Sequence, residues 1–89
     1  MMKAKYAFTE NAWEDYCYWQ MQDKKTLARI NDLIKDIERN GNKGTGKPEL
    51  LKGTKGCWSR RINQKDRLVY KFEDDRIVIL QCRTHYSNH

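Results

Sequence analysis

Histidine, proline and cysteine are scarce in this chain of 89 residues, which holds two, one and three of them. The cysteines Cys17, Cys57 and Cys82 are odd in number, lie far apart and form no CxxC pair or Cys/His zinc pattern. The histidines His85 and His89 are four residues apart at the end of the sequence. We therefore expect reduced thiols, no disulfide framework and no metal ion.

Long apolar runs are also missing, since no run approaches the roughly 18 residues that read as a membrane span. Residues 1–5, MMKAK, lack the apolar region of a signal peptide. These absences predict a protein of the cytoplasm that makes no membrane contact.

The length predicts one domain over residues 1–89. A chain this short buries only about 60–65% of its unfolded surface, so its core is thin. Although 34% of the residues are charged, the aromatic content of 11% supplies side chains for a hydrophobic core, so we expect a folded domain.

What the chain does have is a basic second half. Residues 1–40 contain seven Lys/Arg and seven Asp/Glu, whereas residues 41–89 contain eleven Lys/Arg and five Asp/Glu. The whole net charge of +6 therefore falls in the second half. This distribution predicts a neutral scaffold joined to a basic surface that binds a polyanion.

The neutral half predicts two helices. Thr9 is an N-cap for a helix over about residues 10–21, with Trp13, Tyr16 and Trp19 expected in the core. Asp23 is the next N-cap, and the apolar stripe of the second helix ends near Gly41. The two helices are expected to pair as an antiparallel hairpin.

A loop rich in glycine and lysine follows at residues 41–48. It lacks the Walker pattern, because Lys47 is followed by Pro48 rather than by Ser or Thr and no strand precedes it. We expect a mobile basic loop there.

The periodicity then changes to two. Strands are predicted over residues 57–62, 67–73 and 76–82, in addition to a first strand over 3–8, and residues 83–86 extend the last strand or start another. Short turns fall at 63–66 and 74–75. The pattern predicts an α+β domain, with the helical hairpin packed on a mainly antiparallel sheet.

The basic half also contains each residue type needed to cleave RNA without a metal. That reaction needs a base for the 2′-hydroxyl, cations for the phosphorane and an acid for the 5′-oxygen. Glu49 is the candidate base and His85 the candidate acid. The candidate phosphate-binding and orienting residues are Lys52, Arg61, Arg67, Arg83 and Tyr86.

Each of these residues has an ordinary structural interpretation as well. Arg60 and Arg61 are compatible with a solvated strand edge. Arg67 is compatible with a simple ion pair to Asp66 or Glu73. Taken singly, none of them identifies a site.

Taken together, several segments resemble a known family. They are WEDYCYWQ at 13–20, INDLIKD at 30–36, GKPELLK at 46–52, WSRRI at 58–62, RLVY at 67–70 and CRTHY at 82–86. In this order they resemble the YoeB/Txe toxins of the RelE/ParE superfamily, over nearly the whole chain. The resemblance implies a RelE-like fold and a ribosome-dependent endonuclease that cuts mRNA in the ribosomal A site and needs no cofactor.

The resemblance also implies roles. Glu49 matches the general base, His85 the general acid and Arg67 the arginine that stabilises the transition state. Lys52, Arg61 and Tyr86 match residues that hold the scissile phosphate. The implied partners are the 70S ribosome with its mRNA, a YefM-type antitoxin, operator DNA through the antitoxin complex, and a second copy in a homodimer.

Two other functions remain open at this point. A non-enzymatic toxin of the ParE kind would bind a protein target such as gyrase, and would not need the set Glu49, Arg67 and His85. A passive RNA-binding domain would show salt-sensitive affinity without cleavage.

Overall fold

The computed structural model describes residues 5–84. The elements in chain order are β1 (Tyr6–Phe8), α1 (Glu10–Gln22), α2 (Lys24–Asn40), β2 (Glu49–Leu50), β3 (Trp58–Arg61), β4 (Arg67–Glu73) and β5 (Arg76–Gln81). The predicted hairpin of helices and the last three strands are therefore present, whereas β2 was not foreseen. The candidates His85 and Tyr86 lie outside the described residues.

The two helices start where the caps were expected. The hydroxyl of Thr9 accepts the amide N–H of Ala12 at 3.1 Å, and the carboxylate of Asp23 accepts those of Lys25 and Thr26 at 3.1 and 3.3 Å. These bonds, and above all the one from the Thr26 hydroxyl, lower the pKa of Asp23. Because Asp23 alone separates the helices, the chain reverses within one residue.

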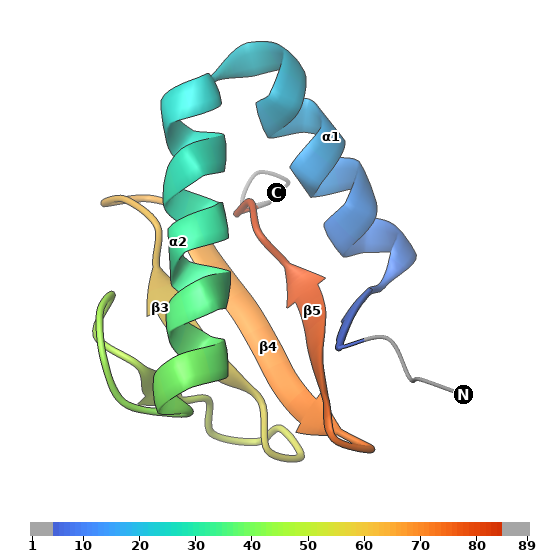
Figure 1. Ribbon diagram of the computed structural model, residues 1–89, viewed down its shortest axis with the longest axis vertical. Coiled ribbons are helices and arrows are strands. Elements are labelled where there is room, and N and C mark those ends of the chain that lie inside the picture. The colour runs from blue at the N-terminus through green and yellow to red at the C-terminus, as the bar shows by residue number, and fades with distance from the viewer. Residues whose placement is uncertain (1–4, 85–89) are drawn as a thin grey trace.

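The sheet has the order β1-β5-β4-β3-β2. Among the strands of residues 5–84, β1 runs parallel to its neighbour β5, and the other pairs are antiparallel. The helices and the mainly antiparallel sheet confirm the predicted α+β architecture. In Figure 1, α2 crosses in front of the sheet and α1 lies beside it, toward the end of β5.

The core lies between the helices and one face of the sheet. The side chains of α2 that enter it are Ile30, Leu33, Ile34 and Ile37, and those of the sheet include Leu68, Tyr70, Ile77 and Ile79. Strand alternation places Arg67, Val69 and Lys71 on the opposite face. That face is the one on which polar side chains gather near β2, β3 and β4.

The aromatic cluster of α1 departs from its prediction at one position. Trp19 is buried, but Trp13 is 53% exposed and stacks on Tyr16 with ring centroids 5.8 Å apart. Trp13 is therefore a surface residue rather than a core residue, because α1 packs through Ala12, Asp15 and Trp19 instead.

Within the described residues, neither helix is long and apolar enough to cross a membrane.

Candidate active site

Glu49 and Arg67 form the centre of the candidate site. A guanidinium nitrogen of Arg67, Nη1, lies 3.6 Å from Oε1 of the Glu49 carboxylate. The Arg67 side chain is 35% exposed and that of Glu49 65%, so a ligand can reach both. An ion pair of Arg67 with Asp66 or Glu73 is the alternative interpretation from the sequence. In the structure the carboxylate of Glu73 pairs with Lys71 at 3.7 Å.

Strand register explains how residues so far apart in sequence meet. Glu49 on β2 pairs with Ser59 on β3, and Arg61 on β3 pairs with Arg67 on β4. Since side chains alternate across a strand, all four belong to the face of the sheet opposite the helices. The strand β2 thus fixes Glu49 at a sheet edge rather than in a free loop.

The pairing of Arg61 with Arg67 has an electrostatic consequence. Like charges directly opposite each other on adjacent strands destabilise the pair. Glu49 offsets part of this repulsion, and an added phosphate would offset more, because arginine holds phosphate oxygens in a bidentate geometry. Lys52 lies exposed in the turn that follows β2 and adds a further positive charge nearby in sequence.

Ser59 is a site residue that the sequence did not single out. It is only 1% exposed, and its Oγ lies 3.5 Å from Nη1 of Arg67. Ser59 therefore underlies the Glu49–Arg67 pair. Its alternation with Arg61 was visible in the sequence, but the proximity to Arg67 depends on register, which the sequence did not supply.

Arg60 is fully buried, so the interpretation of Arg60 and Arg61 as a solvated strand edge is wrong for Arg60. Its guanidinium donates to the Asp36 carboxylate and to the backbone carbonyls of Thr45 at 3.0 Å, Gly41 at 2.7 Å and Lys43 at 2.8 Å. These bonds satisfy the buried charge and hold the loop 41–48 that leads into Glu49. The loop was expected to be mobile, but Arg60 ties it down.

One further hydrogen bond and one close approach of the backbone fix the same loop. The amide N–H of Arg61 donates to the carbonyl of Gly46 at 2.6 Å. Gly44 has φ +121°, and a Cβ there would come within 2.1 Å of the Asp36 carboxylate, so only glycine fits. The hydrogen bond from Arg60 is also the main cause of a lowered pKa at Asp36.

Arg83 has a different environment from the other candidate phosphate ligands. Its guanidinium carbon lies 3.4 Å from the ring centroid of Tyr18 on α1. β5 ends at Gln81, so Arg83 and Thr84 do not extend it, which rules out one of the two predicted alternatives for residues 83–86. The amide N–H of Thr84 donates to the side chain of Asp66 at 2.9 Å instead of to a neighbouring strand.

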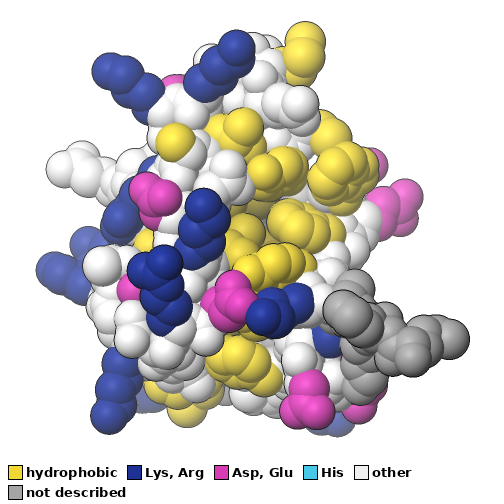
Figure 2. Space-filling model, viewed as in Figure 1, with side chains coloured by type: hydrophobic (Ala, Val, Ile, Leu, Met, Phe, Trp, Pro, Cys, Tyr) yellow, Lys and Arg dark blue, Asp and Glu magenta, His cyan; other side chains and the backbone are white. Residues whose placement is uncertain are grey.

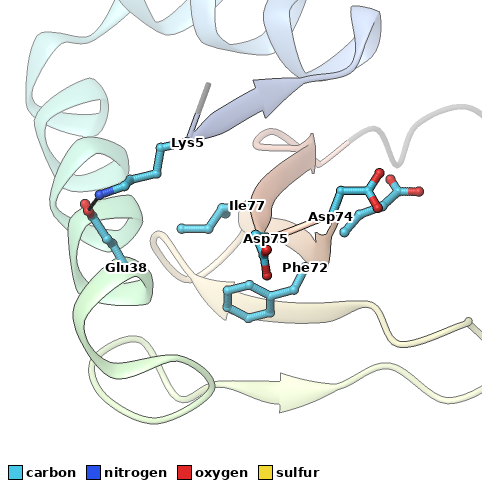
Figure 3. A pocket seen from close by; sticks show the side chains of 7 residues that line it. Lys5, Glu38, Phe72, Asp74, Asp75 and Ile77 are labelled. Carbon is cyan, nitrogen blue, oxygen red and sulfur yellow. Dashed lines mark hydrogen bonds and ion pairs between the residues drawn. The ribbon is translucent and has the colours of Figure 1, made fainter. Parts of the chain in front are cut away.

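A hollow at the other end of the sheet does not suit an anionic substrate. It measures about 520 Å³ and is lined by Lys5, Phe72, Ile77 and the acids Glu38, Glu73, Asp74 and Asp75. Figure 3 shows Lys5 directed to Glu38, so its charge is already engaged. That hydrogen bond also lowers the pKa of Glu38. Four carboxylates around one engaged ammonium repel phosphate, and the site stays with Glu49 and Arg67.

Among residues 5–84, no group of three or more His, Cys, Asp or Glu side chains is placed to hold a metal ion. The positive charges at the Glu49–Arg67 centre are those of arginine guanidinium groups.

A helical hairpin on one face of a sheet, with a carboxylate and paired arginines on the other, defines a small basic α+β domain with an open, charged sheet face. Comparison with known proteins gives the family. Residues 8–86 match the sequence profile of the YoeB-like toxin of bacterial type II toxin–antitoxin systems. The chain belongs to this family.

Individual relatives agree with the family assignment. Toxin YoeB of Streptomyces coelicolor is 56% identical over 80 residues, which cover 89% of this chain and 95% of that protein. A YoeB–YefM complex from Staphylococcus aureus contains a chain with a TM-score of 0.87 and 46% identity, covering 96% of this chain and 100% of the other. The YoeB dimer from the same organism has a TM-score of 0.86 and 47% identity, with the same coverage.

Proposed function

We propose that this toxin is a metal-independent endoribonuclease that cleaves mRNA in the ribosomal A site and so inhibits translation. The observation that carries the proposal is the Glu49–Arg67 contact of 3.6 Å on the open face of the sheet, with Arg61 paired opposite Arg67. A carboxylate beside two arginines supplies a proton acceptor and a binding place for phosphate charge.

The proposed reaction divides the work among these residues. Glu49 accepts the proton of the 2′-hydroxyl, whose oxygen attacks the adjacent phosphorus. The Arg67 guanidinium exchanges its contact with the Glu49 carboxylate for one with the phosphate, and it stabilises the charge of the phosphorane. His85 donates a proton to the departing 5′-oxygen, which yields a 2′,3′-cyclic phosphate and a 5′-hydroxyl. Lys52, Arg61, Arg83 and Tyr86 hold and orient the phosphate and its neighbours.

The openness of the site supports dependence on the ribosome. The Glu49 side chain is 65% exposed on a sheet face rather than at the bottom of a cleft. Such a face cannot by itself align the 2′-hydroxyl, the phosphorus and the 5′-oxygen, and alignment supplies a large part of the rate of such reactions. In the proposal the ribosome holds the mRNA against this face, which places the reaction in the cytoplasm.

A YefM-type antitoxin is the proposed protein partner. The Staphylococcus aureus relative is in complex with YefM. In Figure 2, apolar side chains gather between α1 and α2, where a hollow of about 250 Å³ is lined by Tyr6, Phe8, Tyr16, Asn31, Ile34 and Lys35. An acidic, disordered segment that folds on binding would cover this strip and complement the net charge of +6. Operator DNA would be bound through this complex, and a homodimer like that of the relative is the proposed free form.

The test is primer extension on a defined mRNA in a purified translation system, with wild type compared to Glu49→Gln, Arg67→Ala and His85→Ala. We expect a new 5′ end at the A-site codon with wild type only, and only when ribosomes are present. Intact translation without cleavage would contradict the proposal and favour a ParE-like or passive binder. Blocked translation without cleavage would show occlusion of the ribosome instead of catalysis.

A further inference from the structure

The segment between β5 and His85 is held at its backbone by side chains from distant parts of the chain. The amide N–H of Cys82 donates to Oδ2 of Asp15 at 3.0 Å, and the carbonyl of Cys82 accepts the indole N–H of Trp19 at 2.8 Å. Both partners lie on α1, toward which the end of β5 runs in Figure 1. The helix therefore binds both polar groups of residue 82.

Two residues further on, a second carboxylate binds the same segment beyond β5. Oδ1 of Asp66 accepts the amide N–H of Thr84 at 2.9 Å, while its Oδ2 accepts from the side chain of Asn63 at 3.1 Å. The hydroxyl of Thr84 donates to the carbonyl of Lys65 at 2.8 Å. Asp66 thus joins the residue before His85 to the turn that immediately precedes Arg67.

Both carboxylates are buried, since Asp15 is 3% exposed and Asp66 4%. Burying a carboxylate is expensive, and apolar residues of similar volume in such places are often as stabilising or more so. What a buried carboxylate adds is a fixed acceptor for particular N–H groups. Here those groups belong to alternate residues, Cys82 and Thr84, beyond the end of the β5 ladder.

We propose that Asp15 and Asp66 are positioning residues for His85, which hold the backbone of Cys82 and Thr84 and so set the path by which the chain reaches the proposed general acid. The inference rests on the proposed function of His85. It gives a role to part of the WEDYCYWQ segment of α1, which supplies no group to the reaction itself. Because a catalytic group displaced by about 1 Å loses on the order of a hundredfold in rate, a backbone clamp of this kind matters to catalysis.

The test compares two mRNA substrates under single-turnover conditions on programmed ribosomes. One has the natural 5′-oxygen at the scissile bond and the other has a 5′-bridging sulfur. When the 2′-oxygen forms its bond to phosphorus and the P–S bond breaks, sulfur leaves as a thiolate and needs no proton. A variant that harms only the delivery of the proton is therefore slow on the oxygen substrate and recovers on the sulfur substrate.

For Asp15→Asn and Asp66→Asn we expect at least about a tenfold loss of rate on the oxygen substrate, and rates within about threefold of wild type on the sulfur substrate. Glu14→Gln, at the exposed neighbour of Asp15 on α1, is the matched control and is expected to behave as wild type on both. Glu49→Gln is expected to be slow on both, because its defect precedes proton donation.

Equal losses on the two substrates would show that the two carboxylates support the fold or RNA binding, and would overturn the proposal, as would unchanged rates. Should either variant fail to unfold cooperatively in a thermal scan, Trp19→Phe decides. It removes the indole N–H from the Cys82 carbonyl and also shrinks a core side chain, so a loss that sulfur restores supports the positioning role and an equal loss on both substrates overturns it. The variant His85→Ala separates the two hypotheses. If sulfur fails to restore His85→Ala, the proposed acid is wrong; if it restores His85→Ala but neither carboxylate variant, only the positioning role is wrong.

Discussion

Arg67 is the residue on which the proposed chemistry depends most directly. Arg67→Lys keeps the charge but loses the planar pair of N–H groups that fits a phosphate. We expect Arg67→Ala to reduce the single-turnover cleavage rate by about 10²–10³ and Arg67→Lys to recover only a small part of that loss. The measurement is cleavage on programmed ribosomes at saturating toxin. Full activity of Arg67→Lys would mean that charge alone suffices.

Cys82 gives a prediction that is independent of the catalytic proposal. Burial, together with the charges of Asp15 and Asp66, raises the pKa of its thiol to about 12. At pH 8 only about one molecule in ten thousand then carries the reactive thiolate. Treatment of the native protein with iodoacetamide should modify the partly exposed Cys17 and Cys57 and spare Cys82, as peptide mass analysis can show. In denaturant all three should react.

The sequence alone identified some of these residues and missed others for a physical reason. Glu49, Arg61 and Arg67 were named from their chemistry, and the structure brings them together. Arg60 was misjudged because composition does not say which of two adjacent arginines faces the helices. Asp66 was assigned to a turn only, since its bond to the amide of Thr84 joins segments 18 residues apart.

At the scale of elements, the loop 41–48 depends on one side chain. Replacing Arg60 by leucine removes the buried cation that pairs with Asp36 and the donor shared by three backbone carbonyls, while Asp36 keeps its hydrogen bonds from Asn40 and Thr45. Loss of one partner of a buried ion pair typically costs about 3–5 kcal/mol, and we expect a decrease of this size in the free energy of unfolding. Urea titration followed by circular dichroism measures it. Arg61→Leu, at the exposed neighbour, should change stability by less than about 1 kcal/mol.

The same ion pair predicts a pH dependence of stability. The folded state lowers the pKa of Asp36 from its ordinary value of 3.8, chiefly through the hydrogen bond from Arg60. The stabilisation is therefore complete above the ordinary pKa and is lost as the pH falls through the lower folded value. The difference in unfolding free energy between wild type and Asp36→Asn should be constant from pH 7 to about pH 5 and shrink below pH 4. A difference that grows on acidification would contradict this account.

Elements were easier to predict than single residues, with one informative exception. Helix caps such as Thr9 and Asp23 act within three residues, so the sequence contains the whole signal. The two-residue strand β2 has no such local signal, because Glu49 and Leu50 become a strand only by pairing with Ser59 and Trp58. The order of the strands likewise depends on packing rather than on local propensity.

At the scale of the whole molecule, the net charge of +6 predicts how binding responds to salt. Each phosphate contact to a single strand contributes a slope of about −0.7 when log affinity is plotted against log salt concentration. We expect Lys52→Gln to weaken binding to programmed ribosomes on every mRNA tested and to reduce the slope by about one contact. Filter binding between 50 and 200 mM salt measures it. An unchanged slope would place Lys52 away from the RNA.

The order of the strands also bears on how the chain acquires its shape during synthesis. β5 is the latest strand to be made among the described residues, yet it lies between β1 and β4. Until residues 76–81 leave the exit tunnel, β1 has no neighbour to pair with and one side of β4 is open. Assembly of the sheet is therefore a late event that joins the earliest and latest strands, a long-range closure that is slow compared with local pairing. Before β5 is in place, the apolar faces of both helices are exposed. A chaperone or a protein partner therefore has the largest apolar surface to bind in that interval.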